Sequence, residues 1–281
     1  MAKRIYTIEE TEKYADGLLK ELNQDNINKL YKADSKRVKH SNILNWNGVT
    51  KDDSSKYYIN IISEKIYPKV VDMLKKIPFI DRKNGFPKRK KGEKTRIGKF
   101  KISERDIAEC IELNDLGDNI EFEIPLNAKR SDRGVGKIDF LTYNKDTDTI
   151  TIVELKAPNS TEGLLRAAFE IQTYYQQFSE EFFNKFLTIK LCKKIQIKRE
   201  NVKKAVVLFN NTCEISNEAN DLYKVAAEFC DDKDSSKFEY LAKIFDDLEI
   251  DLYIYETPET PKDYENSYKN LKLVCYRKHN S

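Results

Sequence analysis

Gly-Lys-Ile-Asp-Phe-Leu-Thr-Tyr (136–143) and Thr-Ile-Thr-Ile-Val-Glu-Leu-Lys (149–156) are the two stretches that decide the fold of this chain. Both are rich in β-branched and aromatic residues, which favour extended backbone. Residues 144–148 between them consist of Asn, Asp, Lys and Thr, and these supply turn chemistry. The two stretches therefore predict a β-hairpin.

The hairpin carries three ionisable side chains that are candidates for a functional site. Because side chains alternate along a strand, Glu154 and Lys156 are expected on one face, with Leu155 on the other. Asp139 stands near the start of the first strand and Glu154 near the end of the second, so antiparallel pairing places both acids at one end of the sheet. Two carboxylates beside a lysine on rigid strands can hold a divalent cation and orient a water molecule for attack on phosphorus.

These residues resemble the active-site signature of the PD-(D/E)XK nuclease superfamily, which has the restriction-endonuclease-like fold. In that family an aspartate on one strand is followed by Glu-x-Lys on the next. Asp139, Glu154 and Lys156 match this pattern, with fourteen residues between the two acids. The chain departs from it at Ile138, which stands where the name of the family has proline. The resemblance covers roughly residues 100–256.

The order of elements around the hairpin fits the same resemblance. Ser103 is a candidate N-cap for a helix over 103–113, where Ile107, Ala108 and Ile111 recur at helical spacing. The pattern then predicts a strand at 120–126, the hairpin, a helix over 161–178, a buried strand at 205–209 and a strand at 250–255. This αβββαβ order, followed by a further helix and strand, predicts an α/β fold with a central mixed sheet flanked by helices.

The resemblance also implies roles for the residues. Asp139, Glu154 and the backbone carbonyl of Leu155 would bind the metal. Magnesium suits such oxygen ligands because it keeps several waters and accepts phosphate oxygens, and Mn²⁺ is expected to substitute for it. Lys156 would position the attacking water and stabilise the scissile phosphate. The plainer alternative is a lysine that only neutralises Glu154.

Three further residues are candidates with open alternatives. Glu104 occupies the position of an additional acidic residue that some family members carry on the first helix, but it could equally be a first-turn glutamate that favours the helix dipole. Gln172 is a candidate polar residue near the site. The RecB-like branch of the family carries glutamine and tyrosine four residues apart, whereas Gln172 has Tyr175 at a spacing of three. Arg166 could reach a phosphate, or pair with Glu162 or Glu170.

Charge is distributed unevenly along the chain. The net charge is only +3, but residues 1–101 carry 25 Lys+Arg against 13 Asp+Glu, while the remainder carries 25 against 34. Ten of the twenty residues in the segment 82–101 are basic, and the glycines and Pro87 of this segment predict a loop. Such a loop could follow a phosphate backbone, or serve as an ordinary solubilising linker. The candidate nucleic-acid-binding residues in it are Lys88, Arg89, Lys90, Lys91, Lys94 and Arg96.

The region before this loop is predicted to be helical. Thr7 and Glu10 form a capping box ahead of a helix that runs to about Leu22, and a second helical stretch lies near 26–33. A third helix is predicted over about 54–76, with Pro68 as a break or kink. The chain thus divides into a helical region (1–81), a basic loop (82–101) and a nuclease-like domain (102–281), although the modest apolar content of the first region favours packing against the third.

Composition excludes several other chemistries. Two histidines give little support to histidine-dependent hydrolases or His-rich zinc sites, and five scattered cysteines without a signal peptide predict a cytoplasmic protein with no disulfide framework. No apolar run is long enough to cross a membrane. The expected function is a magnesium-dependent DNA endonuclease in restriction, defence or repair. The alternatives are an RNA-cleaving enzyme of the same fold and a nucleic-acid-binding protein that does not cleave. Cutting both strands with one site per chain would call for a homodimer.

Overall fold

A six-stranded mixed sheet organises the structure, a computed structural model that describes residues 5–30, 38–78, 104–125, 136–158, 160–177, 180–192, 194, 196–210, 217–233, 235–256, 268–269 and 271–279. Its strands lie side by side in chain order, so each strand pairs with its neighbours in sequence. They are β1 (Asp118–Pro125), β2 (Lys137–Asn144), β3 (Thr149–Leu155), β4 (Val202–Asn210), β5 (Ile250–Glu256) and β6 (Leu273–Arg277). The prediction of an α/β fold with a mixed sheet flanked by helices is confirmed.

Strand direction changes across the sheet. The pairs β1–β2, β2–β3 and β5–β6 are antiparallel, whereas β3–β4 and β4–β5 are parallel. The predicted hairpin is therefore present as β2 and β3. Every residue of β3 is buried, because helices cover both faces of the central strands. Glu154 consequently belongs to the interior of the molecule, whereas Asp139, on β2, is half-buried.

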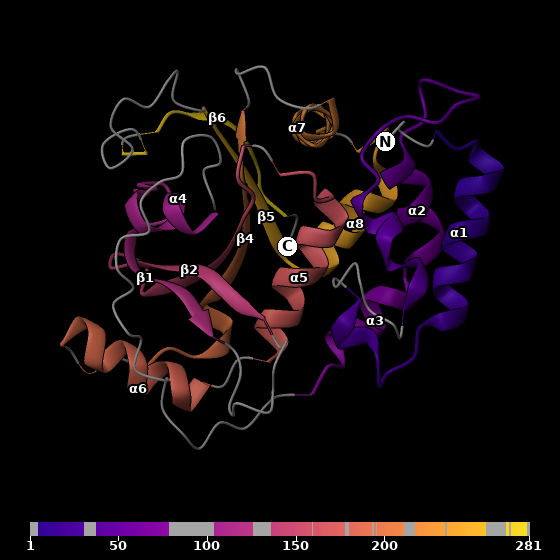
Figure 1. The fold of residues 1–281 in the computed structure, drawn as a ribbon. Helices are drawn as coiled ribbons and strands as arrows, with labels where there is room; N and C mark the ends of the chain where they lie inside the picture. Colours follow the sequence, from indigo (N-terminus) through magenta and orange to yellow (C-terminus); the bar gives the residue numbers. More distant parts are fainter. Residues whose placement is uncertain are drawn as a thin grey trace.

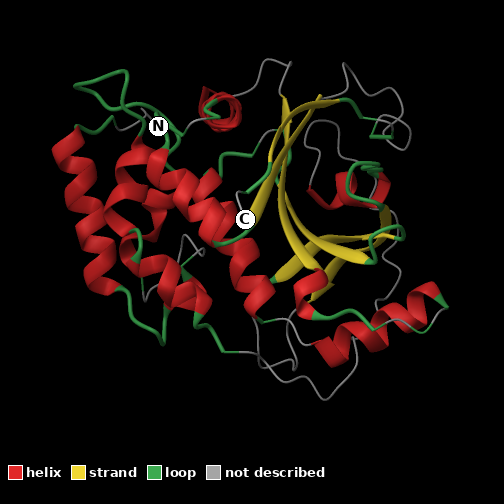
Figure 2. Cartoon of the chain, turned by 180° about the vertical axis from the view of Figure 1, so that it is seen from behind, coloured by secondary structure: helices red, strands yellow, loops and turns green. Residues whose placement is uncertain are grey.

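Helices cover the two faces unequally (Figure 1). On one face α4 (Glu104–Cys110) packs over β1 and β2, in a small apolar cluster with Ile107, Phe140 and Val153. On the other face α5 (Leu164–Gln176) and α8 (Glu239–Asp247) lie between the sheet and the N-terminal helices, and α7 (Asn217–Asp231) covers the same side. Figure 2 shows this arrangement from behind, with the sheet at one side and most helices at the other. The helix α6 (Glu180–Leu191) follows α5 and lies below the β1–β2 edge in Figure 1.

The described residues of the N-terminal region form three α-helices, α1 (Ile8–Glu21), α2 (Tyr58–Ile66) and α3 (Lys69–Lys75). The capping box is present, since the Thr7 side chain accepts from the Glu10 N–H and the Glu10 carboxylate accepts from the Thr7 N–H. The predicted third helix is broken at Pro68, as expected. It starts at Tyr58 rather than 54 because Thr50 and Asp53 form a hydrogen-bonded turn before it.

The second predicted helical stretch is reduced, within the described residues, to a short 3₁₀ turn, Ile27–Lys29, and another 3₁₀ segment covers Lys39–Asn45. One continuous hydrophobic cluster contains residues of α1, α2 and α3 together with α5, α7, α8 and the sheet. The N-terminal helices therefore share their core with the sheet-bearing part of the chain.

Two observations concern the wider character of the chain. Cys110, Cys192, Cys230 and Cys275, the cysteines within the described residues, are free thiols. None of the described helices combines the length and the apolar character needed to cross a bilayer.

Candidate active site

The two acids of the hairpin meet where β2 begins and β3 ends. Phe140 pairs with Val153, so Asp139 and Glu154 are the next opposed positions, on the face that α5 covers. The Asp139 Oδ2 accepts a hydrogen bond from the backbone N–H of Leu155 at 2.8 Å. The Asp139 side chain is thereby held beside the Leu155 backbone, next to Glu154.

Lys156 lies at the centre of this group with its side chain only 3% exposed. Its Nζ donates to the Glu154 Oε1 at 2.6 Å and to the Glu162 Oε2 at 2.5 Å, and it lies 3.4 Å from the Glu170 Oε2. Lys156 thus neutralises more than the single glutamate that its sequence spacing indicated. A buried ammonium group with several charged acceptors is held in one orientation.

Helix α5 and the turn before it contribute a stripe of polar and charged side chains that the sequence analysis did not identify as a unit. Glu162, Arg166, Glu170 and Tyr174 stand four residues apart, so they share one side of the helix and the turn before it. The Tyr174 hydroxyl donates to the Glu170 Oε1 at 2.5 Å, and the Arg166 Nη2 lies 3.1 Å from the Glu162 Oε1. Glu170 and Tyr174 have the four-residue spacing sought for Gln172, with glutamate in place of glutamine. This four-residue spacing is the sequence feature from which Glu170 and Tyr174 could have been identified.

Glu104 approaches the same group from α4. Its carboxylate accepts from the backbone N–H of Ala157 and interacts electrostatically with Lys156, Glu162 and Glu170. Burial raises the pKa of Glu104, and the two neighbouring glutamates raise it further. Glu104, on α4, therefore lies close to the hairpin residues. This favours the interpretation of Glu104 as an additional acidic residue of the site over a helix-dipole role alone.

Acidic groups outnumber basic groups in the described part of this site. Five carboxyl groups (Glu104, Asp139, Glu154, Glu162 and Glu170) surround two cations (Lys156 and Arg166). Burial, with the help of Asp139 and Glu170, raises the pKa of Glu154. Burial lowers the pKa of Lys156, but the carboxylates of Glu154, Glu170 and Glu162 outweigh it and the pKa rises overall. The site stabilises positive charge and resists full ionisation of its acids.

A divalent cation would satisfy this arrangement. The Glu154 Oε2 is buried and has no hydrogen-bond partner in the described part of the chain. Carboxylate oxygens of Glu154, Glu162 and Glu170 lie within 4.8 Å of one another. An unpartnered buried carboxylate oxygen is costly unless a cation or donor reaches it. The residues present therefore fit a hard cation with oxygen ligands.

The pKa of Asp139 gives a test of this charge imbalance. Burial raises the pKa of Asp139 from 3.8 to about 7 in the folded chain. The folded state thus holds this proton more tightly than the unfolded state, and stability is lost as the pH rises from about 4 through about 7. We expect Asp139→Asn, which cannot ionise, to stabilise the metal-free protein at pH 8.5 by up to about 4 kcal/mol, with little effect at pH 4.

Urea unfolding in a chelator at the two pH values measures this difference. The exposed Asp16→Asn serves as the control for a lost surface carboxylate. An equal effect of Asp139→Asn at both pH values would show that the Asp139 carboxyl does not carry the proton assigned to it.

Gln172 does not join the carboxylate group. Its Oε1 accepts from the Lys204 Nζ at 3.0 Å, and Lys204 pairs with Ile152, further from the strand end than Glu154. Burial lowers the pKa of Lys204 to about 7. Gln172 therefore serves a second buried lysine, and its predicted place beside the metal site is taken by Glu170.

The N-terminal region holds the start of α5 in place. The helix has no side-chain cap of its own, and its first N–H groups are served by residues more than a hundred positions away. The Asn45 Oδ1 accepts from the Gly163 N–H at 3.1 Å, and the Asn47 Oδ1 from the Leu164 N–H at 3.2 Å. The Asn47 Nδ2 donates in turn to the Glu162 carbonyl at 3.3 Å. The N-terminal region thereby positions the turn that carries Glu162.

Gly163 is required for this close approach. A Cβ at position 163 would lie 1.8 Å from the backbone carbonyl oxygen of Leu44. We expect Gly163→Ala to destabilise the protein by about 3 kcal/mol or more, because a backbone atom cannot move aside as a side chain can. Chemical denaturation would measure this loss.

Gly17→Ala is the matched control, since its added Cβ meets only the ring of His40, at 2.9 Å from Nε2, within a helix that alanine favours. A similar loss for both variants would contradict the role assigned to the contact between Gly163 and Leu44.

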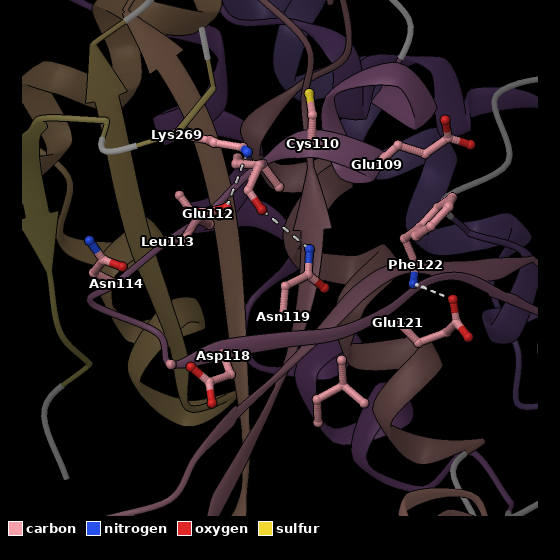
Figure 3. A pocket seen from close by; sticks show the side chains of 13 residues that line it. Glu109, Cys110, Glu112, Leu113, Asn114, Asp118, Asn119, Glu121, Phe122 and Lys269 are labelled. Atoms are coloured by element: carbon pink, nitrogen blue, oxygen red, sulfur yellow. Dashed lines mark hydrogen bonds and ion pairs between the residues drawn. The ribbon is translucent and has the colours of Figure 1, made fainter. Parts of the chain in front are cut away.

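The predicted nucleic-acid-binding residues at 88–96 fall outside the described residues. A pocket of about 550 Å³ lies between the C-terminal end of α4 and the outer strand β1 (Figure 3). Its charged lining is mainly acidic, with Glu109, Glu112, Asp118 and Glu121 against Lys269, so it is poorly suited to a phosphate-bearing ligand.

Comparison with known proteins provides no relative, since no protein-family model, curated protein or solved structure matches the chain.

Proposed function

We propose that this chain is a metal-dependent nuclease that hydrolyses phosphodiester bonds in DNA, on a restriction-endonuclease-like core. The observation that carries the proposal is the convergence of Asp139, Glu154 and Lys156 at one end of the hairpin, where a buried Glu154 oxygen lacks a partner. The αβββαβ order of α4, β1, β2, β3, α5 and β4, with α6 and a short 3₁₀ turn between α5 and β4, supports it.

The residues divide the proposed chemistry between them. Asp139, Glu154 and the Leu155 carbonyl would hold Mg²⁺ or Mn²⁺. When bound, such an ion lowers the pKa of a coordinated water and neutralises charge on the phosphate. The raised pKa of Lys156 keeps its ammonium group protonated, so we assign it the role of a donor to phosphate oxygen rather than of a base.

The choice of DNA rests on analogy with most members of the family that the hairpin resembles. The same three side chains could serve RNA cleavage, since they would contact the phosphate that both polymers share. Restriction, defence and repair are the processes in which such an enzyme would act.

The test is cleavage of end-labelled DNA and RNA by the purified chain with Mg²⁺, with Mn²⁺ and with a chelator. We expect DNA cleavage that either metal supports and the chelator abolishes. Cleavage confined to RNA would identify the alternative substrate, and binding without cleavage would identify a non-catalytic protein. Failure to bind or cut either polymer would overturn the proposal.

A further inference from the structure

The Glu162 carboxylate lies between the two cations of the site. Its Oε2 is 2.5 Å from the Lys156 Nζ, and its Oε1 is 3.1 Å from the Arg166 Nη2. Each oxygen of the Glu162 carboxylate therefore pairs with a different cation. A phosphodiester group also presents two unesterified oxygens from one centre, so it can replace a carboxylate between the same two donors.

Glu162 is the most accessible acidic partner of Lys156. Its side chain is 32% exposed, against 13% for Glu170 and 4% for Glu154. Glu162 also precedes the first residue of α5. The hydrogen bond from the Asn47 Nδ2 holds its backbone carbonyl, which leaves the side chain as the part able to move. An anion arriving from solvent would thus meet Glu162 before the other acids.

Arg166 retains unused donor capacity at this position. Its Nη1 lies 3.5 Å from the Asn45 Oδ1, and its Nε is buried without an acceptor in the described part of the chain. A guanidinium group that leaves one buried N–H unpaired can accommodate a second acceptor oxygen. The Gly163 and Leu164 N–H groups at the start of α5 already donate to Asn45 and Asn47, so we assign the anion to the two cationic side chains.

We propose that Lys156 and Arg166 form a phosphate-binding subsite for the nucleic-acid backbone, and that the Glu162 carboxylate occupies this subsite in the free protein. The inference rests on the proposed function and adds a subsite and an internal competitor to it. Lys156 keeps its ion pairs with Glu154 and Glu170 while a phosphate replaces Glu162, so its buried charge stays compensated during the exchange. The apparent affinity for nucleic acid equals the intrinsic affinity multiplied by the fraction of molecules in which Glu162 has left the subsite.

Removing the charge of Glu162 should therefore strengthen binding. We expect Glu162→Gln to bind a short labelled DNA about tenfold more tightly than the wild type, measured in a chelator so that no cleavage occurs. Glu170→Gln is the matched control, because it removes the same charge from a residue that pairs with Lys156 and the Tyr174 hydroxyl. It should change the affinity much less. Adding Arg166→Gln to Glu162→Gln should cancel the gain.

An equal increase in DNA affinity for Glu162→Gln and Glu170→Gln would show that the effect comes only from the lost negative charge, and would overturn the subsite. An unchanged or weaker affinity of Glu162→Gln would also overturn it, and weaker Mn²⁺ binding in the same variant would instead mark Glu162 as a metal ligand. If the wild type cleaves DNA while Glu162→Gln binds no more tightly, the subsite alone fails. If neither protein binds DNA, the proposed function fails with it.

Discussion

Glu154→Gln is expected to lower metal-dependent DNA cleavage by at least about 10³-fold, because it removes a charged ligand from the centre that would activate water and stabilise the phosphate. Glutamine has nearly the same shape as glutamate and can still accept from the Lys156 Nζ. The substitution thus tests the charge of Glu154 with little change in packing. Cleavage rates at saturating Mg²⁺ and DNA measure the effect.

Glu154→Gln should remain folded and should still bind DNA. The pKa of Glu154 is raised because burial and the nearby acids disfavour its ionised form, so a neutral side chain fits the metal-free site well. The surface substitution Glu109→Gln, on α4, provides the control for loss of one carboxylate elsewhere. Cleavage by Glu154→Gln at the rate of the wild type would remove Glu154 from the proposed mechanism.

Lys156→Met is expected to destabilise the metal-free protein by about 3–5 kcal/mol, since it leaves the carboxylates of Glu154, Glu162 and Glu170 without their buried cation. Methionine keeps most of the apolar stem, so the loss reports charge rather than volume. Excess Mg²⁺ should restore part of the stability, because an ion that binds only the folded state stabilises it by mass action. Cleavage should not return with it.

Urea unfolding with a chelator and with Mg²⁺ separates these effects. Lys204→Met is the matched control, because Lys204 is a second buried lysine on the same face of the sheet and contacts Gln172. Its pKa is already lowered to about 7 by burial, so the loss of its charge should cost less and should not respond to Mg²⁺. Equal and metal-independent losses in the two variants would argue against a cation-binding role for the acids around Lys156.

Local sequence was sufficient to predict the hairpin and the relative placement of its three candidate side chains. Alternation along 149–156 fixes the relative faces of Glu154, Leu155 and Lys156, and turn residues at 144–148 set the pairing that brings Asp139 opposite Glu154. Both effects act over a few residues and do not depend on the rest of the fold. The break at Pro68 and the capping box at Thr7 could be predicted for the same reason.

Weaker local patterns predict less. The further helix expected before the strand at 250–255 is present as two helices, α7 and α8, and Leu222, Val225, Ala226 and Phe229 lie at helical spacing in α7. The strand β6 is only five residues long and half exposed, so its apolar content is too slight to distinguish it from a tail. Gln172 is a buried, hydrogen-bonded polar group, but its partner is Lys204, which spacing alone could not predict.

Distant contacts determine the remaining features of the site. Lys156 is buried because α5 and the turn before it cover the end of β3, and the carboxylates it meets come from positions 154 to 170. The start of α5 is held by Asn45 and Asn47, more than a hundred residues earlier, through hydrogen bonds to single N–H groups. Such contacts leave no periodic trace in the chain, because they depend on where separate elements pack. Residue order therefore specified the acids and the lysine, whereas packing set their burial, their charge balance and the place of Glu162.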